Sequence, residues 1–228
     1  MSLNTVTQID NKVRIKNVLI SVFDKSGLAA LVNGLTETCR DIRFFSTGGT
    51  YTAIAEILGD AAAKKHLISV SDYTGQPEMQ GGLVKTLDFK IYLGLLSEKY
   101  NEAHIKDIER TSGVVFDMVV VNLYPFKQVV VRDDVTPEQA RSNIDIGGPC
   151  MIRASAKNYI RVASVTSSDD YPEILKELRE NDGCLSFATR FKLMGKAFAH
   201  TSSYDTAIAK FFGELSQKTA SAAYKQND

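Results

Sequence analysis

Short apolar segments alternate with amphipathic ones along the first three quarters of the chain. Segments with helical periodicity cover residues 28–38, 51–58, 102–110 and 136–142. The apolar runs beside them are short, rich in β-branched or aromatic residues and followed by turn-forming residues, as buried strands are; they cover residues 18–22, 42–45, 67–70, 119–121 and 162–165. This alternation predicts an α/β fold, in which helices cover a mainly parallel sheet.

The pattern changes after residue 166. Two further segments have helical periodicity, 169–179 and 186–215. An apolar stripe, typical of a core or an interface, recurs at helical spacing in the second of them: Phe187, Phe191, Met194 and Phe198. We therefore expect an N-terminal arm over residues 1–15, an α/β core over 16–165, and a helical extension over 166–228 that belongs to the same compact unit.

The composition limits the kinds of molecule that the chain is expected to bind. The 228 residues are 44% hydrophobic, enough to bury one large core. Lys plus Arg equals Asp plus Glu at 27 each, so no overall field attracts nucleic acid or an anionic membrane, and a phosphorylated small molecule fits better. The three cysteines are far apart and do not have the spacing of zinc ligands. No apolar run is long enough to span a bilayer, and the first residues lack the apolar region of a signal peptide. A cytoplasmic protein is the expectation.

Polar residues follow the first two predicted strands, at the edge of a parallel sheet where ligands gather. Asp24, Lys25 and Ser26 come after the first strand, and the sequence STGGT, residues 46–50, leads from the second strand into a helix. Hydroxyls, paired glycines and a helix N-terminus suit a phosphate monoester, because backbone N–H groups can surround it. An ordinary capped turn has the same composition, so this segment alone leaves both interpretations open.

The next two strands are also followed by candidate polar groups. After the third strand comes a long polar loop that carries Lys85 and Thr86, and a loop of this length is usually functional or disordered. The fourth strand leads into NLYPF, which offers the Asn122 amide and the Tyr124 phenol. The alternatives are a solvated charge at Lys85 and a packed Tyr124 with a satisfied hydroxyl.

The segment NIDIGGPCMIRASAKN, residues 143–158, combines a carboxylate, a glycine pair and a lysine. Gly147 and Gly148 permit a turn, and the helix after it directs free N–H groups toward an anion or a developing oxyanion. We expect Asp145 and Lys157 to face one pocket across this turn. The alternative is that Asp145 caps the helix and Lys157 is a solvated charge at its end.

The chain resembles the inosine monophosphate (IMP) cyclohydrolase domain over roughly residues 16–215. The resemblance rests on seven motifs in the family's order and spacing: VFDKSGL, STGGT, DYTGQPEM, GGLVKTL, VVVNLYPF, IDIGGPCMIRASAKN and RVASVTSSDDY. That domain is normally the N-terminal part of a bifunctional enzyme that also carries AICAR transformylase, whose domain we expect to be absent here. The implied fold is methylglyoxal-synthase-like, with helices on both faces of a mainly parallel sheet and a C-terminal helical extension.

The resemblance also implies a reaction and its residues. The carboxamide nitrogen of formamidoimidazole carboxamide ribonucleotide (FAICAR) attacks the formyl carbon, water leaves and IMP forms, with no cofactor and no metal. The implied catalytic residues are Lys85, Tyr124, Asp145 and Lys157. The implied substrate-binding residues are Ser21, Asp24, Lys25, Ser26, Thr47, Gly48, Gly49, Thr50, Thr86, Asn122, Ile146 and Gly147, with Asn122 reading the base or the carboxamide. The implied partners are this nucleotide, a second copy of the chain in a homodimer, and a separate transformylase protein.

Some positions depart from the family pattern. Phe23 stands where serine is common, Leu83 where arginine is common, and Asp88 and Phe89 where His-Pro is usual. Loss of a cation and a hydroxyl near the ligand weakens phosphate binding, because charge-assisted hydrogen bonds are the stronger kind. A catalytically weak nucleotide-binding or regulatory module on the same fold is therefore a second hypothesis. Methylglyoxal synthase, a third, is disfavoured because IDIGG and RASAKN lie outside what that smaller fold needs.

Overall fold

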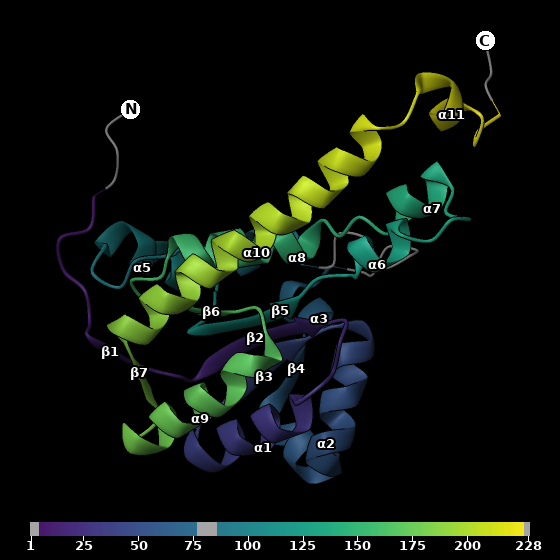
Figure 1. The fold of residues 1–228 in the computed structure, drawn as a ribbon. Coiled ribbons are helices and arrows are strands. Elements are labelled where there is room, and N and C mark those ends of the chain that lie inside the picture. The colour runs from purple at the N-terminus through teal and green to yellow at the C-terminus, as the bar shows by residue number, and fades with distance from the viewer. Residues whose placement is uncertain (1–4, 77–85, 226–228) are drawn as a thin grey trace.

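The computed structural model describes residues 5–76 and 86–225, and a five-stranded parallel sheet lies at its centre (Figure 1). The strands are β2 (Asn17–Val22), β3 (Arg43–Ser46), β4 (Leu67–Ser69), β5 (Met118–Asn122) and β6 (Ala163–Val165). All neighbouring pairs are parallel, in the order β4-β3-β2-β5-β6. The five predicted strands and the α/β class are confirmed.

The strand order reverses between β2 and β5. From β2 the chain moves outward through β3 to β4, and it then returns to the other side of β2 to form β5 and β6. At such a switch point the connections leave in opposite directions and open a crevice beyond the strand ends. The register pairs Ser21 with Val121 and Val22 with Asn122, so the residues that follow β2 and β5 emerge side by side.

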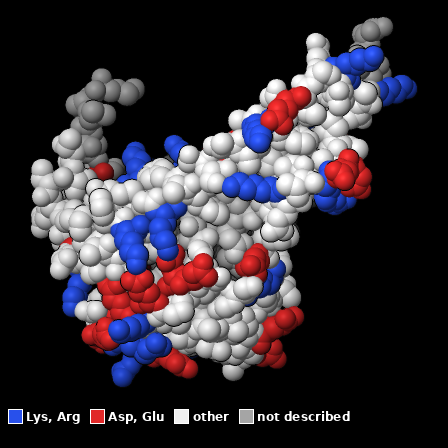
Figure 2. All heavy atoms as spheres, in the orientation of Figure 1, with Lys and Arg blue, Asp and Glu red and all other residues white. Residues whose placement is uncertain are grey.

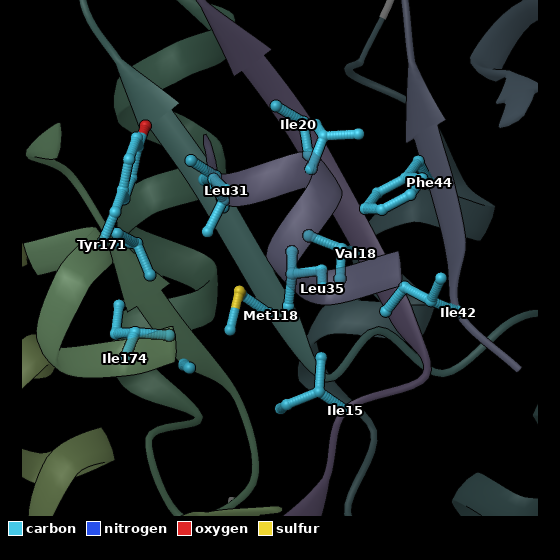
Figure 3. Packing of buried hydrophobic residues seen from close by; sticks show 14 of the residues in the cluster. Ile15, Val18, Ile20, Leu31, Leu35, Ile42, Phe44, Met118, Tyr171 and Ile174 are labelled. Carbon is cyan, nitrogen blue, oxygen red and sulfur yellow. The ribbon is translucent and has the colours of Figure 1, made fainter. Parts of the chain in front are cut away.

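Helices cover both faces of the sheet (Figure 1). One face packs against α1 (Leu28–Thr38), α2 (Gly48–His66) and α9 (Tyr171–Glu180), and the other against α4 (Phe89–Leu96), α8 (Gly147–Lys157) and α10 (Phe187–Gly213). Ile20 of β2 lies in the first core, shown in Figure 3, whereas its neighbour Leu19 lies in the second. A strand buried on both faces explains the uninterrupted apolar run in the sequence.

The two ends of the chain are less separate than the sequence suggested. Strand β1 (Lys12–Arg14), within the predicted arm, pairs antiparallel with β7 (Cys184–Ser186), within the predicted helical extension. The buried Arg190 guanidinium strengthens this junction by donating to the carbonyls of Asp10 and Leu185 at 2.7 and 2.6 Å. Three-residue strands are too short to show periodicity, so their pairing is visible only in the fold.

The remaining helical segments are short, and the last of them lies beyond the end of α10, away from the sheet (Figure 1). They are α3 (Val70–Thr74), α5 (Glu102–Arg110), α6 (Phe126–Val130), α7 (Pro137–Ser142), the 3₁₀ turn η2 (Ser168–Asp170) and α11 (Gln217–Ser221). Helix α10 buries Leu193 and Ala197, whereas Phe191 of the predicted stripe is 51% exposed, so that stripe borders the core. Within residues 5–76 and 86–225, no helix has the length and apolar character needed to cross a bilayer.

Acidic and basic side chains alternate over the face of the molecule drawn in Figure 2. Lysines and arginines there lie next to aspartates and glutamates, as the balanced composition leads one to expect. Charge on this face is therefore local, and the cavity at the strand ends supplies its own electrostatic environment.

Candidate active site

A cavity of about 820 Å³ lies beyond the carboxyl ends of β2, β3 and β5, at the switch point of the sheet. Most of the predicted site residues line it: Ser21, Lys25, Thr47, Gly48, Gly49, Thr50, Thr86, Asn122, Tyr124, Asp145, Ile146 and Gly147. Its volume is in the range of small-molecule sites. The fold thus gathers segments separated by more than a hundred residues around one cavity.

One end of the cavity combines a cation with a helix N-terminus. Strand β3 ends at Ser46, and Gly48 turns the chain into α2 with a φ of 54°, a conformation that favours glycine. The Lys25 ammonium lies 4.0 Å from the point where a Cβ on Gly49 would lie, so it stands over the first turn of α2. Exposed N–H groups, the helix dipole and an ammonium together form an anion site of the kind that holds phosphate.

The Asp145 carboxylate also lines the cavity. Its Oδ1 accepts the Gly148 N–H at 2.9 Å, and its own N–H donates to the Tyr204 hydroxyl at 2.8 Å. Burial raises the pKa of Asp145, while the N–H groups of Gly148 and Tyr124 lower it. Asp145 therefore caps α8, as one interpretation held, and it also presents a carboxyl whose raised pKa suits acid–base work.

Gly147 and Gly148, which follow Asp145, allow neighbouring side chains to approach the backbone at the start of α8 closely. A Cβ on Gly148 would lie 2.5 Å from Leu123 Cδ2 and 2.6 Å from Asp145 Oδ2, and one on Gly147 would lie 2.7 Å from Thr86 Oγ1. A side chain at either position would displace its neighbours. Both glycines are therefore required for the packing of α8 against the NLYPF segment and against Thr86.

Two family models together match most of the chain. Residues 27–150 match the MGS-like domain, and residues 155–228 match the AICARFT/IMPCHase bienzyme. The chain belongs to the MGS-like domain family. The first match includes most of the residues that line the cavity, from Thr47 to Gly148, whereas Lys25 and the lining residues of β2 precede it.

Individual relatives of this MGS-like chain are purine biosynthesis proteins. It is 46% identical over 197 residues to the bifunctional purine biosynthesis protein PurH of Ruminiclostridium cellulolyticum, and 47% identical over 209 residues to that of Chlorobium phaeobacteroides. These alignments cover 86% and 91% of this chain but only 37% and 38% of the relatives, so the chain spans less than two fifths of their length. The sequence resemblance to this bifunctional enzyme family is confirmed.

A solved structure shares the fold. The crystal structure of ForH superposes with a TM-score of 0.75 at 29% sequence identity, covering 87% of this chain and 97% of that one. This coverage is larger than that of the MGS-like model, so the shared architecture includes part of the chain outside residues 27–150.

Two predicted substrate-binding residues that line the cavity also make structural hydrogen bonds. Thr50 Oγ1 accepts the Val22 N–H at 3.1 Å and donates to the Val22 carbonyl at 3.0 Å, which connects α2 to the end of β2. Asn122 Oδ1 accepts the N–H groups of Phe23 and Asp24 at 2.7 and 3.0 Å, and its Nδ2 donates to the Asp24 carbonyl at 2.7 Å. The Asn122 side chain thus fixes the loop after β2, and its contact with the base or the carboxamide stays a prediction.

Asp24 and Ser26 shape that loop and do not line the cavity. Asp24 Oδ1 accepts the Ser26 hydroxyl at 2.6 Å and the Ser26 N–H at 2.9 Å, and these bonds lower the pKa of Asp24. Such a local turn holds the backbone on either side of Lys25. The structure thus gives both residues a place in the loop that carries Lys25, and their contact with substrate stays a prediction.

Two aromatic side chains meet at the cavity. Tyr124, a predicted catalytic residue, and Phe23, a departure from the family pattern, are 47% and 53% exposed, and their rings meet edge to face at 5.5 Å and 80°. The prediction missed Leu87 and Met151, which add further apolar surface. Leu87 directly follows the predicted Thr86, and this adjacency was the available signal for it.

The structure does not bring Lys157 to Asp145. Helix α8 begins at Gly147 and ends at Lys157, where the side chain is exposed, so the two residues mark opposite ends of the helix. At 1.5 Å per residue this separation is about 15 Å along the axis. The expectation that both face one pocket therefore fails within a single chain. Lys85, the remaining predicted catalytic residue, lies outside the described residues.

Proposed function

We propose that the chain is an IMP cyclohydrolase, which closes the six-membered ring of FAICAR and releases water in purine biosynthesis. One observation carries the proposal: a single cavity joins the anion site at Lys25 and α2 to the carboxyl of Asp145 and the phenol of Tyr124. The relatives named as bifunctional purine biosynthesis proteins support the same substrate class.

In this proposal the ribose phosphate binds at the Lys25 end. The N–H groups of the first turn of α2 donate hydrogen bonds to the phosphate oxygens, and the Lys25 ammonium compensates the phosphate charge. The imidazole carboxamide then extends toward Asp145. A rigid anchor at one end of the substrate lowers the entropy loss of aligning the carboxamide nitrogen with the formyl carbon.

The chemical step needs a base, oxyanion donors and a proton source. Asp145 accepts a proton from the carboxamide nitrogen as the new C–N bond forms, and the negative charge that develops on the formyl oxygen is stabilised by the Tyr124 hydroxyl and the N–H groups at the start of α8. The C–O bond of the former formyl group then breaks, and water leaves. It carries the formyl oxygen, one proton from the carboxamide nitrogen and one proton from the formamido nitrogen. We retain Lys85 as a proposed further donor; the proposed role of Lys157 requires that it come from a second copy of the chain, consistent with the expected homodimer.

The second candidate is a nucleotide-binding module with little turnover. The observation that favours it is Phe23, which fills part of the cavity where a hydroxyl is common in the family. Such a protein would bind IMP at the Lys25 end but would not align the reacting atoms.

The deciding experiment mixes the purified chain with FAICAR and follows IMP formation by absorbance. Turnover that falls about 10²-fold or more in Asp145→Asn, but is kept in Lys127→Ala, supports the cyclohydrolase. Lys127 is the matched cation outside the cavity, where its ammonium donates to Ser203 Oγ at 2.6 Å. IMP binding without turnover would support the binding module, and absence of both would overturn the nucleotide assignment.

A further inference from the structure

Two aromatic side chains that line the cavity contact each other. Phe23 follows β2, Tyr124 follows β5, and the two rings meet edge to face with centroids 5.5 Å apart. About half of each side chain is exposed, and both line the cavity. A large apolar side chain half-exposed inside a site is better explained by a ligand that covers it than by packing alone.

The backbone holds Phe23 firmly in this position. Its N–H donates to Asn122 Oδ1 at 2.7 Å, and its carbonyl accepts from Lys25 Nζ at 3.5 Å. Asn122 is the last residue of β5, so Phe23 is fixed to the strand that leads to Tyr124. The ring pair is therefore organised before any ligand arrives, which lowers the entropy cost of using it as a binding surface.

We propose that Phe23 determines specificity by packing, together with Tyr124, against the planar heteroaromatic ring of a nucleoside monophosphate. This inference rests on the proposed function, because it assumes that a phosphate occupies the neighbouring Lys25 end. The faces of a purine or imidazole ring are apolar and polarisable, and they pack favourably against aromatic side chains. The groups at the Lys25 end recognise only the phosphate, so selectivity for the base requires a separate surface.

The experiment measures the affinities of IMP and of ribose 5-phosphate by titration calorimetry. The two ligands share the ribose phosphate and differ in the base, so the ratio of their affinities isolates base recognition. Loss of aromatic stacking by substitution with alanine weakens binding by roughly 5- to 100-fold in other systems. Because Phe23 is only half buried by protein, we expect Phe23→Ala to lower the affinity for IMP by about 10-fold and the affinity for ribose 5-phosphate by less than about twofold. Phe23→Tyr, which keeps the ring, should restore IMP binding.

Phe191→Ala is the matched control. Phe191 is 51% exposed and meets the Tyr159 ring at 5.5 Å and 70°, nearly the geometry of the Phe23 pair, but it lies on α10 and does not line the cavity. We expect this variant to leave both affinities unchanged. A loss in this control as large as in Phe23→Ala would overturn the inference, because it would trace the effect to general packing.

The remaining outcomes separate this inference from the proposed function. If Phe23→Ala lowers the affinities for both ligands equally, or changes neither affinity, the inference is overturned even if the wild-type chain converts FAICAR to IMP. A base-dependent loss in Phe23→Ala would support the inference even if the wild-type chain shows no turnover. Wild-type protein that binds neither ligand would overturn both.

Discussion

Replacement of Asp145 by asparagine separates the two roles of this side chain. The carboxylate caps α8 through the Gly148 N–H, and in the proposed reaction it accepts a proton. Asparagine keeps an oxygen that accepts the same N–H, whereas alanine removes it. The pair Asp145→Asn and Asp145→Ala therefore distinguishes the structural contribution from the chemical one.

The structure predicts opposite effects of these variants on stability at neutral pH. Alanine loses the cap, which costs roughly 0.5–2 kcal/mol of unfolding free energy. Burial raises the pKa of Asp145 in the folded state, so the folded chain binds more protons than the unfolded chain between the ordinary carboxyl pKa, about 3.9, and the raised value. The contribution of Asp145 to wild-type stability therefore falls as pH rises through this window. At pH 7 Asp145→Asn, which carries no charge to desolvate, should be at least as stable as wild type.

Urea unfolding from pH 4 to 7, combined with the FAICAR assay, tests the argument. The stability of Asp145→Asn relative to wild type should increase with pH, and its kcat should be about 10²-fold lower. If the asparagine variant is as unstable as the alanine variant at pH 7, the carboxylate is a net stabilising charge and the reasoning fails. Near-normal kcat in the folded asparagine variant would remove Asp145 from the chemistry.

Further predictions concern other parts of the site. Lys25→Ala should weaken IMP and ribose 5-phosphate equally, by about 10-fold, because it removes a charge-assisted contact to the phosphate they share; calorimetry with Lys127→Ala as control checks this. Asn122→Ala removes three hydrogen bonds from the loop after β2, so urea unfolding should show a loss of about 1–3 kcal/mol and the assay a higher KM. Asp145→Asn and Lys157→Ala should each be weakly active alone. Because about 15 Å separates the two residues along α8, the proposed site takes them from different copies, and the two variants should regain part of the activity when they are unfolded and refolded together. Two inactive variants with no recovery on mixing would contradict a site shared between copies. Turnover should persist in EDTA, because the proposed reaction assigns proton transfer to Asp145 and oxyanion stabilisation to Tyr124 and backbone N–H groups; activity that disappears and returns with a divalent ion would contradict this mechanism.

The sequence by itself determined the five strands of the central sheet, most of the longer helices and most of the residues that line the cavity. Local patterns carry this information, since a short β-branched run before a turn predicts a buried strand wherever it lies. The α/β order then placed the residues after each strand at one edge of the sheet. Lys25, Gly49 and Tyr124 were found in this way, and the observed cavity gathers them with Asp145.

Only the tertiary structure decided what each side chain contacts. Asn122 and the loop after β2 are about a hundred residues apart, and their hydrogen bonds depend on the register of β2 against β5. The edge-to-face contact of Phe23 with Tyr124 depends on the same register. The separation of Lys157 from Asp145 depends on where α8 begins, because an uninterrupted helix holds residues at its two ends apart however close they are in sequence.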